Sequence, residues 1–200
     1  MDNYFTIETT SIAEFKDRGS KFISNAFQIE NAVDFKSKLS AIKKEHIKAV
    51  HHCFAYRIGL GGDNFRINDD GEPSGSAGKP ILGQIDSKKV TNTAIVVTRY
   101  FGGTLLGVPG LINAYKTAAA LALQTTPIIQ KPIMIPYEIA FDYLHQNDII
   151  RLLKQYNCVI LESNINLFST IKFDIPKRRE AEALIKMQEM HNITIKKILC

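Results

Sequence analysis

The chain has 200 residues, enough for one large domain or two small ones. Hydrophobic residues make up 45% of it and charged residues 22%, as in ordinary soluble globular proteins. The formal net charge of +5 is spread over both halves, so it is compatible with a nucleic-acid or ribosome partner without requiring one.

Cysteine usage and the hydropathy pattern exclude several classes of protein. Cys53, Cys158 and Cys200 are far apart and form no Cys-x-x-Cys pair, so neither a disulfide framework nor a zinc knuckle is predicted. The N-terminus shows no signal peptide, and no apolar run approaches the ~20 residues of a membrane span. We therefore expect a cytoplasmic protein with no membrane segment, no metal and no cofactor.

The first elements are β-strands followed by one helix. Residues 4–7 and 21–27 are rich in β-branched and aromatic residues, within a strand-forming region over 4–28. Asn31 is a good N-cap, and the apolar residues behind it recur at spacings of four and three. This pattern predicts a helix over about 32–46.

The region 49–58 is predicted to be a strand that carries two adjacent histidines. His51 and His52 must then point to opposite faces of the sheet, so they cannot bind one metal together. We expect one of them to pack inside and the other, assigned here as His52, to face a surface or a site. A short strand is also predicted over residues 65–67, after a glycine turn.

The stretch from Asp69 to Gly83 is the most unusual in the chain. It contains four glycines, two prolines and three acidic residues, and it ends in apolar Ile81 and Leu82. Glycine permits positive φ and proline fixes φ, so this density predicts one defined backbone path. The stretch is either an ordered turn before a helix over about 75–86 or one wall of a binding site.

The clearest strand spans 93–101, a nearly continuous apolar run typical of a central strand. A glycine-rich turn over 102–110 leads into an Ala/Leu-rich helix over about 111–123. A strand, a glycine turn and a helix can form an anion site, to which Arg99 could add a bidentate contact. The alternative is a tight connection in which Arg99 forms an ion pair.

Turn residues and two prolines over 125–132 predict a domain boundary, giving domains of 1–130 and 131–200. The second domain is predicted to contain strand 134–141, helix 143–156, strands 158–162 and 165–175, helix 177–190 and strand 193–199. This β-α-β-β-α-β order is ferredoxin-like. The basic cluster 177–179 is either a solvated helix start or a nucleic-acid contact.

Several motifs of catalytic or ion sites are missing. The P-loop pattern fails because Pro73 and Pro80 stand where a glycine and a hydroxyl residue are required. The calcium-loop spacing also fails, so the acids of the 69–72 turn are read as a solvated turn rather than a cation site. The two serines of the loop lie in no G-x-S-x-G elbow.

Several segments together resemble the YigZ/IMPACT family over about residues 15–125. The segments are Gly19-Ser-Lys-Phe-Ile, His52-Cys-Phe-Ala-Tyr, Asp69-Asp-Gly-Glu-Pro-Ser-Gly-Ser-Ala-Gly-Lys-Pro-Ile-Leu, Val97-Thr-Arg-Tyr-Phe-Gly-Gly-Thr-Leu-Leu-Gly and Gly110-Leu. The C-terminal part resembles the small domain that bacterial members append, which is similar to the last domain of elongation factor G. Pro109 and Asn113 depart from the family's typical glycine and arginine, which weakens a phosphate site at this turn.

The resemblance implies an α+β protein with two domains. The N-terminal one has a mixed sheet with helices packed on it and the β-α-β topology of a small-subunit ribosomal protein and of galactokinase-type sugar kinases. The C-terminal one is a ferredoxin-like βαββαβ domain. The resemblance also implies that no catalytic activity is established, that eukaryotic relatives regulate translation, and that bacterial relatives have been suggested to bind nucleic acid.

Three functions follow as hypotheses. The first is a non-enzymatic cytosolic binding protein that associates with RNA or the ribosome as a translation regulator. The second is a small-molecule protein or enzyme for a phosphate ester or nucleotide, with its site between the 71–78 loop and the 99–110 turn. The third is a module that binds a protein partner in translation control. The expected binding residues are His52, Tyr56, Glu72, Ser74, Gly75, Ser76, Arg99, Tyr100, Gly102, Gly103 and Tyr115; the oligomeric state is left open.

Overall fold

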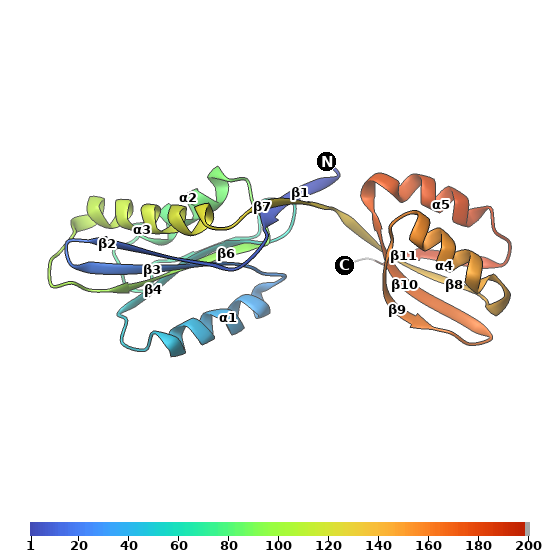
Figure 1. The fold of residues 1–200 in the computed structure, drawn as a ribbon, viewed down its shortest axis with the longest axis horizontal. Helices are drawn as coiled ribbons and strands as arrows, with labels where there is room; N and C mark the ends of the chain where they lie inside the picture. The colour runs from blue at the N-terminus through green and yellow to red at the C-terminus, as the bar shows by residue number, and fades with distance from the viewer. Residues whose placement is uncertain (199–200) are drawn as a thin grey trace. The chain divides into compact units, whose positions relative to one another are not determined.

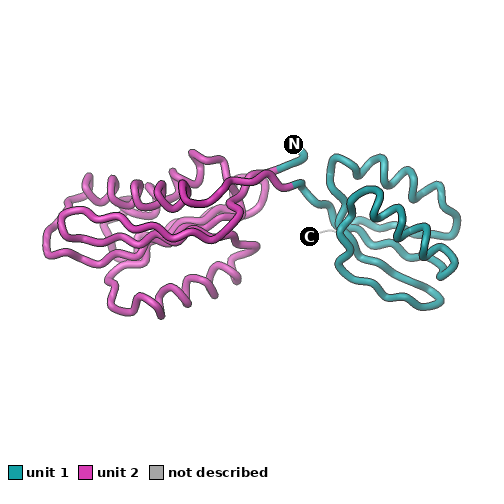
Figure 2. Tube along the Cα trace, in the orientation of Figure 1, with its two compact units in different colours: residues 1–3, 132–200 teal, residues 4–131 magenta. Residues whose placement is uncertain are grey.

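The computed structural model describes residues 1–198, which divide into two compact units. One unit is residues 4–131, and the other joins residues 1–3 to the chain from Pro132 onward (Figure 2). The first three residues belong with the second unit because the Ile133 amide donates to the Asp2 carbonyl over 2.8 Å.

The unit 4–131 contains a five-stranded sheet with the order β2-β3-β6-β4-β5. Its elements, in chain order and with a separate β1–β7 ribbon, are β1 (Asn3–Ile7), β2 (Ser11–Asp17), β3 (Ser20–Gln28), α1 (Ala32–Glu45), β4 (His51–Arg57), β5 (Phe65–Asn68), α2 (Gly78–Ser87), β6 (Thr93–Tyr100), α3 (Gly107–Gln124) and β7 (Ile128–Pro132). Helices α2 and α3 cover one face of the sheet and α1 covers the other (Figure 1).

The strand order explains the direction of pairing. Strands β3 and β4 are linked through α1 and both pair antiparallel with β6, which lies between them. Strands β5 and β6 are linked through α2 and both pair antiparallel with β4. In each β-α-β unit, another strand therefore lies between the two strands that the helix connects. All four strand pairs of this sheet are antiparallel, whereas a mixed sheet was expected.

Two apolar cores hold the layers together. The larger packs Ile81 and Ile85 of α2 and the alanines of α3 against the sheet. The smaller packs Phe35 and Ile42 of α1 against Phe54 and its strand neighbours on the other face. Because side chains alternate along a strand, consecutive residues of β4 and β6 enter different cores.

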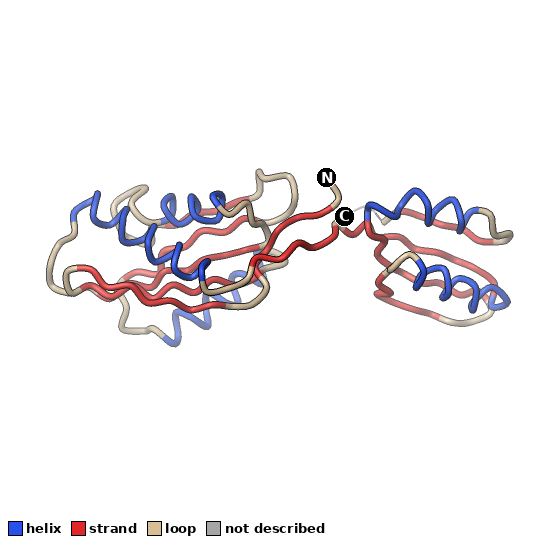
Figure 3. Tube along the Cα trace, turned by 45° about the horizontal axis from the view of Figure 1, so that its top comes forward, coloured by secondary structure: helices blue, strands red, loops and turns tan. Residues whose placement is uncertain are grey.

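The second unit is ferredoxin-like, as expected. Its strands are ordered β11-β8-β10-β9 and pair antiparallel, and both helices lie on one face of the sheet (Figures 1 and 3). Its elements are β8 (Met134–Asp142), η1 (Tyr143–His145), α4 (Gln146–Gln155), β9 (Val159–Asn164), β10 (Phe168–Pro176), η2 (Lys177–Arg179), α5 (Glu180–Gln188) and β11 (Ile193–Lys197). The strand expected over 193–199 ends at Lys197, and residue 199 lies outside the described residues.

The α+β class, the helices and the principal strands are confirmed. The sequence does not single out strand β2, because its inward positions include the small Ser11 and Ala13 while Ile12 points outward, 63% exposed. The prolines beside strand β7 favour turns there, although the segment pairs with β1. None of the helices in the described residues is both long and apolar enough to cross a membrane.

Candidate functional site

One carboxylate, that of Asp69, fixes the path of the glycine-rich loop. Its Oδ1 accepts from the amides of Ala77 and Gly78 over 3.0 and 2.8 Å, and its Oδ2 accepts from the Gly75 amide over 2.8 Å. Two of these amides belong to the start of α2, so Asp69 caps that helix from a distance. The Ala77 and Gly78 amides, which could attract an anion to the start of α2, are therefore already occupied.

Glu72 is the centre of a buried polar cluster. Its Oε1 accepts from Arg99 Nη1 over 2.7 Å and from the Tyr115 hydroxyl over 2.8 Å. The Glu72 and Arg99 side chains are 4% and 6% exposed, and Tyr115 is fully buried. Burial, with Cys53 and Glu72 beside the hydroxyl, raises the pKa of Tyr115, which therefore stays a hydrogen-bond donor.

The Arg99 guanidinium is held from its other side as well. Its Nη2 donates to Ser20 Oγ over 3.3 Å, and that oxygen also accepts from the Gly102 amide over 3.2 Å. The guanidinium carbon lies 5.5 Å from the ring centre of Phe22 and 5.6 Å from that of Phe101, within cation–π range. Sequence reasoning did not name Ser20 as a site residue, although Gly19-Ser20 is among the family segments.

Cys53 lies behind the cluster, with its Sγ 3.3 Å from the Tyr115 hydroxyl oxygen and 3.0 Å from the Asp69 carbonyl oxygen. Burial raises the pKa of the Cys53 thiol to about 12. A nucleophilic cysteine needs a lowered pKa and access to solvent. The buried Cys53 thiol therefore serves as a packing group and weak donor.

The two adjacent histidines of β4 point to opposite faces, as predicted, but His51 is the one beside Glu72. Its Nε2 lies 3.9 Å from Glu72 Oε1, and its Nδ1 donates to the Asp70 carbonyl over 2.8 Å. His52 lies on the α1 face, where burial and the charge of Lys43 lower its pKa. The register explains the difference, because His51 stands directly opposite Arg99.

Tyr56 and Tyr100 also lie on the α1 face, away from Glu72. Tyr56 is 6% exposed, and its ring packs 4.8 Å from the Phe35 ring. The Tyr100 hydroxyl is 3.0 Å from His46 Nδ1. The expected set of site residues is therefore divided by the sheet into two groups.

The serines and glycines of the loop and the turn divide into buried and exposed members. Ser76 is buried, and its hydroxyl donates to the Pro73 carbonyl over 2.6 Å. Ser74 is exposed, Gly75 is also solvent-accessible, and both lie on the loop surface. Gly102 and Gly103 are exposed as well, and Gly103 has a φ of 86°.

Close backbone approach explains Gly102. A Cβ at this position would lie 1.9 Å from the Gly19 carbonyl carbon and 2.2 Å from the Ser20 nitrogen. No side chain fits there, so the glycine is required by the contact between the turn after β6 and the turn before β3. This contact also brings the Gly102 amide to Ser20.

The start of α3 carries both departures from the family pattern. The helix begins at Gly107, with Pro109 in its first turn, where no intrahelical donor is lost. Asn113 is exposed on the following turn. In the described part of the chain, His, Cys, Asp and Glu residues form no group of three that could hold a metal ion.

The geometry identifies what this arrangement can do chemically. Glu72, Arg99 and Tyr115 bond to one another and so stabilise the junction between the loop and the sheet, while the buried Arg99 Nε has no hydrogen-bond partner among the described residues. The surface above them offers backbone of the two glycine turns, the Ser74 hydroxyl and the edge of His51. This is a small polar surface on a rigid support.

Similarity to known proteins extends over most of the chain. The Impact N-terminal domain matches residues 18–123. The chain is 32% identical to the IMPACT family member YvyE of Bacillus subtilis over 174 residues, covering 87% of this chain and 79% of that protein. It is also 32% identical to the IMPACT family member YigZ of Escherichia coli over 182 residues, covering 90% and 88%.

A solved structure, described as a crystal structure of a hypothetical protein, matches along the whole chain. Its TM-score is 0.80 at 28% identity, and the match covers 100% of this chain and 98% of that one. The domain match and the two relatives carry the same family name, and the matches to the two relatives extend beyond the unit 4–131. The chain therefore belongs to the IMPACT family.

Proposed function

We propose that the protein is a non-enzymatic cytosolic binding protein that associates with RNA or the ribosome and regulates translation. Membership of the IMPACT family supports this, because the resemblance implies that eukaryotic members regulate translation. A protein partner in translation control is the alternative for the same surface. The observation that carries the proposal is the basic face formed by α1 and its neighbours.

The basic face comprises Lys36, Lys43, Lys44 and Arg66, all exposed. Two neighbouring hollows of about 350 and 250 Å³ share Lys36, Leu39 and Lys43 in their walls, and the second is also lined by Arg66. Lys43 Nζ lies 3.6 Å from Asp70. Among the described residues, no carboxylate lies within 4.0 Å of the other three cations, so they are available to phosphates.

The expected signature is salt-dependent binding. Three phosphate contacts on a single strand give a slope of about −2 in log K against log salt, or roughly 20-fold weaker binding between about 50 and 200 mM salt. Fluorescence anisotropy with a single-stranded RNA of about 16 nucleotides would measure this slope. Co-sedimentation with ribosomes at the same two salt concentrations would measure association with the particle.

A charge-reversed pair of variants tests the location. Lys36→Glu with Lys44→Glu should abolish RNA binding at low salt. Lys79→Glu with Lys116→Glu is the matched control, because both lysines are exposed on the helices of the opposite face and the net charge changes equally. Equal loss in both variants would contradict the location, and absence of RNA and ribosome binding at low salt would contradict the function. A partner that is captured after nuclease treatment would favour the protein-binding alternative.

A second candidate function is a phosphate-ester or nucleotide site between the 71–78 loop and the 99–110 turn. The observation that favours it is the position of His51. Its Nδ1 donates to the Asp70 carbonyl over 2.8 Å, and its Nε2 lies 3.9 Å from Glu72 Oε1, so an imidazole and a carboxylate lie side by side at this loop. A thermal-shift screen with nucleotides and sugar phosphates tests it, and a ligand whose shift survives in His51→Ala would remove His51 from the role.

A further inference from the structure

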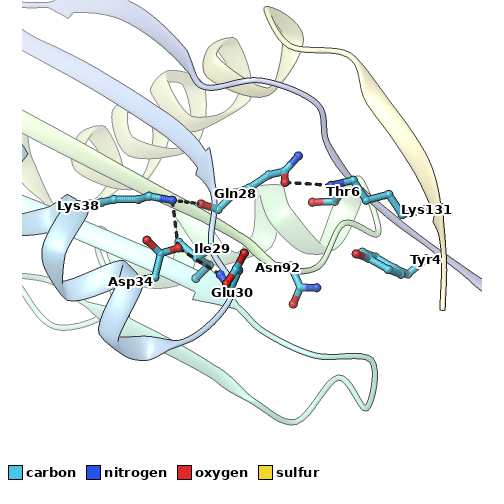
Figure 4. A pocket seen from close by; sticks show the side chains of 9 residues that line it. All are labelled: Tyr4, Thr6, Gln28, Ile29, Glu30, Asp34, Lys38, Asn92 and Lys131. Carbon is cyan, nitrogen blue, oxygen red and sulfur yellow. Dashed lines mark hydrogen bonds and ion pairs between the residues drawn. The ribbon is translucent and has the colours of Figure 1, made fainter. Parts of the chain in front are cut away.

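A separate cavity of the unit 4–131, called here the Glu30–Lys131 cavity, lies at the end of β3 that is far from the glycine turns. Figure 4 shows the side chains that line it. It has a volume of about 380 Å³ and is lined by β1, the end of β3, the start of α1 and the turn before β6. This volume is within the range of small-molecule sites. The lining carries two carboxylates and two ammonium groups, and these four groups differ in how they are paired.

One carboxylate and one ammonium group satisfy each other. Lys38 Nζ donates to Asp34 Oδ2 over 3.0 Å and to the Gln28 carbonyl over 2.7 Å. Asp34 Oδ2 also accepts from the Glu30 amide over 3.2 Å. This pair holds the start of α1 against the end of β3 and forms one wall of the cavity (Figure 4).

The other ammonium group, that of Lys131, has a neutral partner. Its Nζ donates to Gln28 Oε1 over 3.1 Å, which leaves two of its three N–H donors for a ligand. The Gln28 amide is fixed in turn, because its NH₂ group donates to the carbonyls of Ile7 and Glu8. Among the described residues, no carboxylate lies within 4.0 Å of Lys131 Nζ.

Asn92 adds neutral donors to the lining of the same cavity (Figure 4). Its Oδ1 accepts from the Gly59 amide over 2.8 Å and its carbonyl accepts from the Ile29 amide over 2.9 Å. The residue has a φ of 52°, a left-handed backbone conformation that fits the turn before β6. With Oδ1 occupied, the side-chain NH₂ group is left to donate into the cavity.

The remaining carboxylate, that of Glu30, is exposed at the rim of the cavity. Within the described residues, no Lys or Arg nitrogen lies within 4.0 Å of its oxygens. Glu30 and Lys131 enter the cavity from different sides, with Asn92 and the Tyr4 ring beside them (Figure 4). The cavity thus presents one available negative group and one available positive group at separated positions.

We propose that this cavity binds a small zwitterion of the α-amino acid class. The α-carboxylate accepts from Lys131 and Asn92, and the α-ammonium group donates to Glu30. The four charged side chains of the lining sum to zero, which matches a ligand of zero net charge better than a phosphate or a diamine. Charge-assisted hydrogen bonds at both ends would give specificity for a ligand that carries both groups.

Isothermal titration of the full-length protein with the twenty free amino acids, singly and at millimolar concentration, tests the proposal. At least one should bind, and its N-acetyl and its amide derivatives should each bind about tenfold or more weakly, since each lacks one charge. Glu30→Gln should weaken binding of the parent amino acid to a similar degree. It should leave the affinity for the N-acetyl derivative nearly unchanged, because that derivative has no ammonium group for Glu30 to bind.

Lys131→Met should also weaken binding of the parent amino acid. It should leave the affinity for the amide derivative nearly unchanged, because that derivative has no carboxylate for Lys131 to bind. Glu45→Gln and Lys116→Met are the matched controls, because they remove one exposed charge of each sign elsewhere in the unit. Far-UV circular dichroism checks that every variant is folded. The proposal is overturned if no amino acid binds, if the derivatives bind as well as the parent, or if inorganic phosphate or a diamine binds in place of amino acids.

Discussion

The buried pair of Glu72 and Arg99 makes the sharpest prediction about the fold. Replacing Arg99 by Met removes the guanidinium and leaves the Glu72 carboxylate with Tyr115 as its close donor. Both side chains are at most 6% exposed, so water cannot replace the lost partner. Breaking a buried pair in this way costs about 3–5 kcal/mol of unfolding free energy.

A double-mutant cycle separates the pair from its surroundings. Glu72→Gln leaves the Arg99 charge buried without a counter-charge, and we expect a cost of about 2–4 kcal/mol. In the double variant neither charge remains, so its cost should fall short of the sum of the two single costs by about 2 kcal/mol or more.

Hydrogen exchange read by mass spectrometry is the suitable assay, because peptides that cover β6 report the opening of this unit without interference from the other. Tyr115→Phe tests the same cluster, and Tyr137→Phe is its matched control. Each removes a hydroxyl that donates to a glutamate, but Glu180 is 23% exposed and also pairs with Lys197. Tyr137→Phe should leave exchange in β6 unchanged. Additive single costs in the Glu72–Arg99 cycle would refute the coupling.

Two further predictions concern single positions. Gly102→Ala should lower the free energy of unfolding by more than about 3 kcal/mol, because its Cβ would overlap the backbone of Gly19 and Ser20. Gly83→Ala, whose Cβ would meet nothing within 4 Å, should raise it by about 0.5–1 kcal/mol. Thermal denaturation measures both changes, and a tolerated Gly102→Ala would contradict the close approach of the two turns. The pKa of His52 is lowered by burial, so its contribution to stability is complete above the unfolded pKa of about 6.5 and is lost as pH falls toward the folded pKa. Melting temperatures between about pH 7.5 and 5 should therefore fall less steeply in His52→Gln than in the parent, and equal slopes would count against this assignment.

Local patterns were sufficient for most elements. The four-and-three spacing of Phe35, Leu39 and Ile42 behind Asn31 predicted α1, and Asn31 Oδ1 does accept from the amides of Val33 and Asp34 over 2.9 Å. Strand β6 was predicted from its apolar run because a central strand is buried on both faces. These signals depend only on residues that are close together in the sequence, so they can be recognised without the structure.

The composition of the polar cluster depends on pairing between distant strands. The rule of alternation predicted that His51 and His52 face apart, but the register of β4 on β6 decides which one meets Glu72. Nothing in the local sequence of His51 or Arg99 encodes that they stand opposite each other. For the same reason Tyr56 and Tyr100 could not be assigned to the α1 face before the strand order was known.

The acidic and glycine-rich loop illustrates how a motif can look like a site and serve the fold. Asp69 is used by three backbone amides, and Glu72 is used by Arg99 and Tyr115. Asp70 accepts from the His52 amide over 2.7 Å and lies 3.6 Å from Lys43 Nζ. Each of the three carboxylates thus has its partners within the chain, and a ligand that needed one would have to displace a buried or backbone contact. Recognition is therefore expected at charged groups that remain available, which are the cations of the basic face and the Glu30 and Lys131 side chains of the Glu30–Lys131 cavity. The loop itself holds α2 against the sheet.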